Sequence, residues 1–66
     1  MTWEYGLLLR PPMVGTVPRN GLVRMKDFNG KKPYMGFRMW GCVEYDHQLD
    51  DSEIIEYELV YLGKRG

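Results

Sequence analysis

The sequence has very little of the residues that usually stabilise or activate small proteins. Cys42 is the one cysteine in 66 residues, so no intrachain disulfide can form. With the one histidine, His47, it falls short of the four Cys or His ligands of a structural zinc site. We therefore expect no metal or cofactor, and stability must come from apolar packing or from a partner chain. A lone free thiol is typical of a reducing, cytoplasmic location.

Long hydrophobic runs and signal-peptide features are also absent. No run of about 18 apolar residues occurs, so the sequence predicts no membrane span, and the first residues lack a charged start followed by an apolar stretch. What is present is a globular composition, 44% hydrophobic and 14% aromatic. A chain of this length forms one domain, residues 1–66, with a thin core that buries about 60% of its unfolded surface.

A surplus of either charge is missing, because nine basic side chains balance nine acidic ones. Their distribution is uneven: residues 10–38 carry seven basic side chains against Asp27, whereas residues 44–58 carry seven acidic ones and no Lys or Arg. Internal pairing or solvation of these charges is the simplest interpretation. Pairing of the two halves between copies, which would make a homo-oligomer, is an alternative.

Alternation of apolar and polar residues predicts strands. In residues 2–10 one side is apolar, and Pro11 and Pro12 end the segment. Segment 11–21 is expected to be a connecting loop, and residues 22–28 a second strand. Asn29-Gly30 predicts a two-residue hairpin turn. The third strand, 33–46, has two sides, one with Met35, Phe37, Met39, Val43 and Tyr45, the other with Tyr34, Arg38, Trp40, Cys42 and Glu44.

The acidic segment after this strand predicts a short helix. Asp50 and Glu53 have the spacing of a capping box, which begins a helix over residues 51–56. A last strand is expected from residue 57 to Gly63. The predicted fold class is α+β, mainly β: a curled antiparallel sheet or small open barrel of about four strands with one short helix.

The residues that could carry catalysis are badly placed for it. Cys42 and His47 would lie about 16 Å apart on one strand at about 3.3 Å per residue, whereas a nucleophile and its base need about 3 Å. Ser52 falls at the start of the helix, and the acidic run from Asp46 lacks the glycine and glutamate of a calcium-binding EF-hand loop. The sequence predicts no enzymatic activity.

Five residues on or beside the second strand side form the candidate partner-binding set. An aromatic centre with a charged rim is the usual layout of a protein interface, and this side has that composition. The set comprises Arg24, Tyr34, Arg38, Trp40 and Glu44. For Trp40 the alternative is a place in the core beneath the 11–21 loop.

Two segments carry a resemblance to known proteins: "LLLRPPMVGTVPRNGL" and "WGCVEYDHQLDDSEIIEYEL". Together they resemble small accessory domains of bacterial phages and conjugative elements, in which a Val-Pro-x-Gly-Leu-like segment and a Trp-Gly strand precede an acidic helix. The resemblance implies an accessory protein, in some cases one that acts on host machinery, and it implies no catalytic residue.

The leading hypothesis is a non-enzymatic protein-interaction module, such as an inhibitor or regulator of a host complex encoded by a mobile element. The alternative is a small β-barrel that binds single-stranded nucleic acid by stacking bases on aromatic and Arg side chains. The balanced net charge argues against this alternative, since phosphate neutralisation supplies most of the affinity of such proteins.

Overall fold

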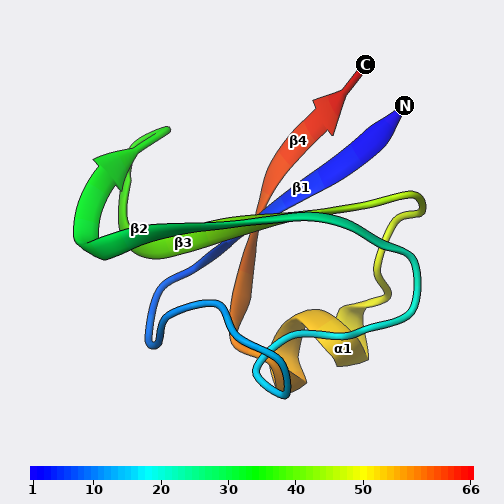
Figure 1. The fold of residues 1–66 in the computed structure, drawn as a ribbon. Coiled ribbons are helices and arrows are strands. Elements are labelled where there is room, and N and C mark those ends of the chain that lie inside the picture. The colour runs from blue at the N-terminus through cyan, green and yellow to red at the C-terminus, as the bar shows by residue number, and fades with distance from the viewer.

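The computed structural model describes all 66 residues as one antiparallel sheet with a short helix (Figure 1). The strand order is β2-β3-β1-β4, so β1 is central and β2 and β4 are the edges. The elements are β1 (Thr2–Leu7), β2 (Leu22–Tyr34), β3 (Phe37–Tyr45), α1 (Asp51–Glu56) and β4 (Leu59–Arg65). The predicted class, a mainly β antiparallel sheet of four strands with one helix, is confirmed. No helix is long and apolar enough to cross a membrane.

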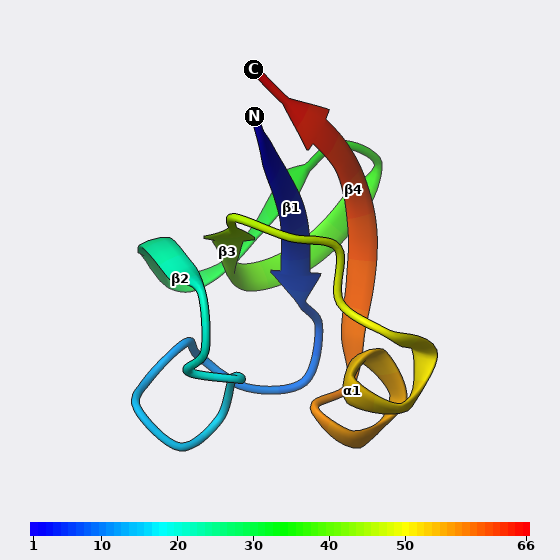
Figure 2. The ribbon, with the colours of Figure 1, turned by 90° about the vertical axis from the view of Figure 1, so that its right-hand side faces the viewer.

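One face of the sheet carries the hydrophobic core. Tyr5 of β1 lies opposite Val43 of β3, and residues opposite each other share a face. The core cluster contains Tyr5, Leu7, Val17, Val43, Tyr45, Leu49 and Leu59. Segment 8–21 and α1 lie on this same side of the sheet (Figures 1 and 2). The core is thin, as expected, because only 14 of 66 residues are buried.

Two core tyrosines attach the loops to the sheet. The hydroxyl of Tyr45 donates a hydrogen bond of 2.6 Å to the backbone oxygen of Pro18. The hydroxyl of Tyr5 accepts one of 2.9 Å from the backbone N–H of Leu49. Burial raises the pKa of both tyrosines. Each hydroxyl is therefore the hydrogen-bond partner of a backbone group in a loop, which would otherwise be buried without one.

The helix begins as predicted. The carboxylate of Asp50 accepts a hydrogen bond of 2.9 Å from the N–H of Glu53, and the carboxylate of Glu53 accepts one of 3.3 Å from the N–H of Asp50. This reciprocal pair is a capping box, and the hydrogen bonds to the carboxylate lower the pKa of Asp50.

The predicted bounds of the last strand are wrong at both ends. Tyr57 caps the end of α1, and Glu58 has a positive φ of 57°, so β4 begins only at Leu59. At the other end Gly63 does not stop the strand. The register between β1 and β4 shifts beside Gly63, whose φ is 134°, and this bulge lets pairing continue to Arg65.

The predicted hairpin turn at Asn29-Gly30 is also wrong. The chain turns at Met35-Gly36, where φ is 51° and 86°, between Tyr34 and Phe37, which lie opposite each other. Asn29 and Gly30 have positive φ inside β2, where the register against β3 shifts between Asp27 and Lys32. They form a bulge that curls the hairpin.

The predicted alternation along β3 is also wrong at the place where its register against β2 shifts, between Met39 and Gly41. Val43 and Tyr45 lie in the core as expected, but Met39 is buried on the opposite face. A Cβ on Gly6, which lies opposite Cys42, would be 2.7 Å from the sulfur of Met39. Met39 and Cys42 therefore share a face, and Trp40 and Gly41 between them lie on the other. Met35 and Phe37 are exposed rather than part of the core.

Candidate binding pocket

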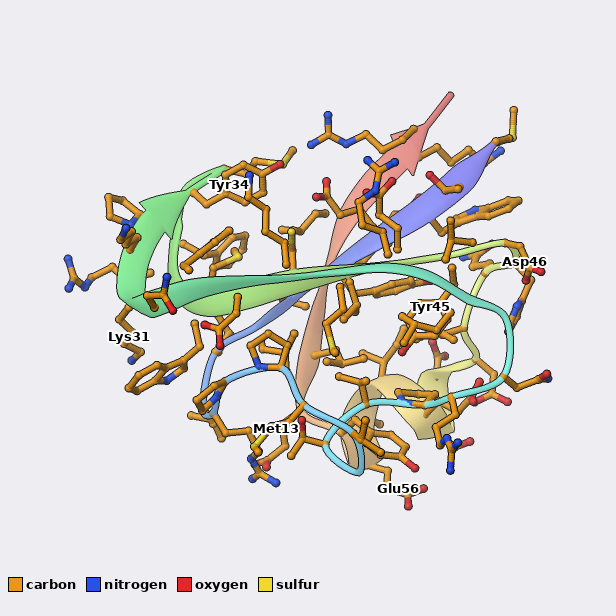
Figure 3. The ribbon with its side chains drawn as sticks, in the orientation of Figure 1. Met13, Lys31, Tyr34, Tyr45, Asp46 and Glu56 are labelled. Carbon is orange, nitrogen blue, oxygen red and sulfur yellow. The ribbon has the colours of Figure 1, made fainter.

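The face of the sheet opposite the core carries a pocket of about 350 Å³. All four strands contribute to its lining, which consists of Glu4, Arg24, Lys26, Phe28, Tyr34, Cys42, Glu44 and Arg65. Figure 3 shows Tyr34 on one side of the β2–β3 hairpin and the core residue Tyr45 on the other. The bulge in β2 curls the hairpin tip toward the pocket side (Figure 1), so a flat sheet face becomes a recess.

A buried carboxylate lies at the floor of this pocket. Glu4 is 3% exposed, and its oxygens bind two partners. Arg65 donates from Nε at 2.8 Å to Oε1, and the hydroxyl of Tyr34 donates at 3.2 Å to Oε2. Arg65 also donates at 2.6 Å to the hydroxyl of Tyr34. A buried charge is tolerated only when it is paired and hydrogen-bonded, and this triad meets that condition for Glu4.

The thiol of Cys42 is buried beside this carboxylate, which favours its protonated form. Burial, followed by a hydrogen bond to Glu4, raises the pKa of Cys42 to about 12, with Lys26 opposing the shift. A thiol must ionise to act as a nucleophile. His47 contacts a different residue, since its Nδ1 lies 2.8 Å from the carboxylate of Asp46. The structure therefore does not bring Cys42 and His47 together.

The second carboxylate of the pocket is Glu44, whose side chain is 15% exposed. It accepts a hydrogen bond of 2.9 Å from the hydroxyl of Thr2. It also forms a long ion pair of 3.5 Å with Arg24, whose side chain is 71% exposed. This contact is the one ion pair of Arg24 in the structure.

Lys26 differs from the other cations of the pocket, because none of the ion pairs in the structure includes it. Its ammonium group lies 6.0 Å from the centre of the Phe28 ring, at the limit of a cation–π contact. Phe28 in turn meets Tyr34 edge to face, with 5.5 Å between ring centres. These two rings form an aromatic wall next to a free positive charge.

The predicted candidate set is divided between the two faces of the sheet. Arg24, Tyr34 and Glu44 line the pocket together. Arg38 and Trp40 do not line it, because the shifted alternation of β3 places both on the side opposite Met39. Partial burial of Trp40 agrees with the alternative interpretation, in which it lies on the face that the loop covers.

Four pocket residues were not anticipated from the sequence: Glu4, Lys26, Phe28 and Arg65. A charged residue in the middle of an apolar first strand was a signal for Glu4, since such a group needs a buried partner. Nothing in the sequence pointed to that partner, because Arg65 stands 61 positions away, in what looked like a free tail.

The structure contains no group of three or more His, Cys, Asp or Glu side chains that could hold a metal ion. The pocket instead combines charged and polar side chains with an aromatic wall formed by Phe28 and Tyr34. The family described as Defence against restriction A C-terminal matches residues 1–64. The chain belongs to this family.

The Defence against restriction A C-terminal family is a phage-associated family, which agrees with the resemblance to phage accessory domains and is more specific. No curated protein and no solved structure matches the chain.

Proposed function

We propose that this domain is a non-enzymatic protein-interaction module that protects phage DNA by binding a component of the host's restriction machinery. The family description supplies the biological setting, defence against restriction. The raised pKa of the buried Cys42 and the separation of its thiol from His47, which contacts Asp46 instead, support a binding role over a catalytic one.

The observation that carries the proposal is the pocket on the face away from the core. A sheet this small covers one face with its own loop and helix, and here the opposite face has an aromatic and charged recess of about 350 Å³. Protein interfaces combine buried aromatic and Arg anchors with a polar rim. Phe28 and Tyr34 supply the aromatic part, and Arg24 and Glu44 supply charged groups.

Site-specific crosslinking tests where the partner binds. A photo-crosslinking amino acid at position 28 lies in the pocket, whereas one at Ile55 lies on the helix, where the native side chain is 75% exposed. We expect a crosslink to a component of the host restriction complex from position 28 and none from position 55. Equal crosslinking from both positions, or crosslinking from position 55 alone, would contradict the assignment of this face.

A restriction assay tests whether the pocket is needed for protection of the phage. Phage carrying the Phe28→Ala variant should plate at lower efficiency on a restricting host than wild type, with no difference on a non-restricting host. Ile55→Ala is the matched control and should leave protection unchanged. Full protection by a folded Phe28→Ala variant would show that the pocket has no part in it.

Binding of single-stranded nucleic acid is the second candidate, supported by the β2–β3 hairpin. Residues 22–38 carry Arg24, Lys26, Lys31, Lys32 and Arg38 against the single acidic residue Asp27. This function predicts an affinity for oligonucleotides that falls steeply as salt is added. An affinity for the restriction complex that falls much less over the same salt range favours the protein partner.

A further inference from the structure

The pocket contains one positive charge more than its own carboxylates neutralise. Glu4 is paired with Arg65, and Glu44 with Arg24, which accounts for both acidic residues of the lining. Lys26 remains without an acidic partner. Lys26 is an exposed residue, and its free ammonium group lines the recess, where its positive charge attracts an anion.

The position of Lys26 allows it to act on a group inside the pocket. It lies opposite Cys42 in the β2–β3 ladder, so its side chain lines the pocket from the edge strand β2, next to the thiol of Cys42. A volume of about 350 Å³ exceeds that of several waters at about 30 Å³ each. An incoming side chain can therefore enter and displace water.

We propose that this pocket receives an acidic side chain, Asp or Glu, of the partner protein, with its carboxylate bound by Lys26 and Arg24. The inference rests on the proposed function, in which this face binds a protein. Lys26 supplies the uncompensated charge, and Arg24 turns from its long contact with Glu44 to share the incoming carboxylate. Phe28 and Tyr34 contact the methylene groups behind that carboxylate.

A carboxylate fits this recess better than the backbone of a nucleic acid. A strand of phosphates needs a continuous row of cations, but the basic residues of the hairpin are divided between its two sides. Figure 3 shows Lys31 extending to the side opposite Tyr34, and Arg38 does not line the pocket. Glu4 and Glu44 add negative charge that would repel a second phosphate.

Titration of the labelled domain, followed by nuclear magnetic resonance, tests the proposal with three probes. These are the blocked tripeptide Gly-Glu-Gly, its neutral counterpart Gly-Gln-Gly, and a thymidine tetranucleotide. We expect the Glu peptide to shift the amide signals of Lys26, Tyr34 and Cys42 in a saturable way. The Gln peptide should leave these signals unchanged, because it has the same shape without the charge.

Two variants test whether Lys26 is responsible for binding of the Glu peptide. Lys26→Gln should weaken binding of the Glu peptide about tenfold, the usual effect of losing one charge-assisted contact. Lys31→Gln removes a charge from the same hairpin but outside the pocket lining, and should change the affinity less than twofold. Equal loss in both variants would overturn the proposal, because it would show general attraction to the hairpin.

The other outcomes are equally decisive. Equal binding of the Glu and Gln peptides, or no shift at Lys26 with either, overturns the proposal. Saturable binding of the tetranucleotide in the pocket, without binding of the Glu peptide, assigns the site to nucleic acid and also overturns it. If the Glu peptide binds as expected while the position 28 crosslink fails, the carboxylate site stands and the proposed function falls. If the position 28 crosslink forms but the Glu peptide does not bind, the proposed function stands and the carboxylate site falls.

Discussion

At the scale of single residues, the chemistry of Cys42 is controlled by its place in the sheet. It is 6% exposed and adjoins the carboxylate of Glu4, and both effects favour the protonated thiol. With a pKa of about 12, roughly one thiol in ten thousand is ionised at pH 8. Burial in the sheet therefore disfavours the thiolate form of Cys42, the form that acts as a nucleophile.

We expect Cys42 to resist modification in the native protein. At pH 8 an aromatic disulfide reagent should label it at least a hundredfold more slowly in buffer than in urea, where the thiol is exposed.

Cys42→Ser should retain partner binding and lower the melting temperature slightly, since Glu4 can accept a hydrogen bond from the serine hydroxyl. Rapid labelling in buffer, or loss of binding with an intact fold, would show a functional thiol.

Trp40 illustrates how one backbone irregularity changes the role of a side chain. Strict alternation predicts a place beside Glu44 at the centre of an interface, but Trp40 does not line the pocket that contains Glu44. The ring of Pro12 from segment 8–21 lies within 2.8 Å of the Cβ position of neighbouring Gly41. Trp40 is half-buried, so we expect it to stabilise the fold.

Trp40→Ala should therefore lower the free energy of unfolding by about 1–3 kcal/mol, less than the 3–5 kcal/mol typical of a fully buried aromatic residue. Urea denaturation measures this loss. Binding of the partner by the fraction that remains folded should be unchanged. A stable Trp40→Ala protein with weakened binding would restore Trp40 to the interface.

At the scale of the elements, the turn of the β2–β3 hairpin carries unfavourable backbone energy. A type I′ turn requires positive φ at both central positions, which Asn and Gly adopt most easily. Met35 occupies the first of them with a φ of 51°. Met35→Asn should raise the free energy of unfolding by about 1 kcal/mol, because the left-handed conformation costs most other residues about 1–2 kcal/mol.

The control for this prediction is Met13→Asn. Met13 is similarly exposed, 55% against 51%, and lies in the loop after β1, without the positive φ. Chemical denaturation should show the gain for position 35 and none for position 13. A loss of stability in Met35→Asn would mean that packing of the methionine outweighs the strain of its backbone.

The start of α1 gives a second test at this scale. Asp50→Ala removes the acceptor for the N–H of Glu53 and should lower the melting temperature measurably on so thin a core. Asp50→Asn keeps an acceptor and should lose less. Because the fold lowers the pKa of Asp50, its contribution is present above the model-peptide value of 3.8 and is lost as the pH falls below it. Equal melting temperatures at pH 7 would show that the cap adds nothing.

The elements show which features the sequence alone could predict. β1, the core side of Tyr5 and Leu7, and α1 follow from local patterns that the structure keeps. The hairpin turn does not, because Asn29-Gly30 is a better turn sequence than Met35-Gly36. A turn at Asn29-Gly30 would leave Val43 and Tyr45 with no partners on β2, whereas the observed register pairs them with Met25 and Leu22. Long-range pairing therefore overrides the local preference.

The pocket was only partly predictable for the same reason. Its candidate residues Tyr34 and Glu44 follow from alternation, but the Glu4–Arg65 pair joins the two ends of the chain. Figure 2 shows the termini side by side, which brings β4 next to β1. No local pattern predicts such a contact, since it depends on the order of the strands in the sheet.

At the scale of the whole molecule, the basic and the acidic parts of the chain form ion pairs with each other at two places. Arg10 pairs with Glu58, and Arg24 with Glu44, so the basic first part of the chain contacts the acidic second part internally. Both pairs are at least partly exposed and stabilise the fold only modestly. Most of the basic hairpin and most of the acidic residues near α1 remain available to other molecules.

The thin core also makes the whole fold sensitive to alkaline pH. Four buried or half-buried groups, Tyr5, Tyr34, Tyr45 and Cys42, have a raised pKa, chiefly because burial disfavours the charged form. Each of them holds its proton in the folded state at a pH where the unfolded chain has released it. Their contribution is therefore complete below the unfolded values, 9.0 for the thiol and 10.0 for the tyrosines, and is lost as the pH rises through the folded values.

We expect the urea midpoint to fall steadily above pH 9 and the protein to be largely unfolded near pH 12. The thiol is the first of these groups to ionise in the unfolded chain, at 9.0, so Cys42→Ser should postpone the fall until about pH 10, where the tyrosines begin to ionise. Tyrosinate absorbance recorded during the same titration should rise together with unfolding, because the buried tyrosines ionise only when the sheet opens. A midpoint that stays level from pH 8 to 11, or tyrosinate that forms well before unfolding, would mean that water reaches these hydroxyls in the folded state.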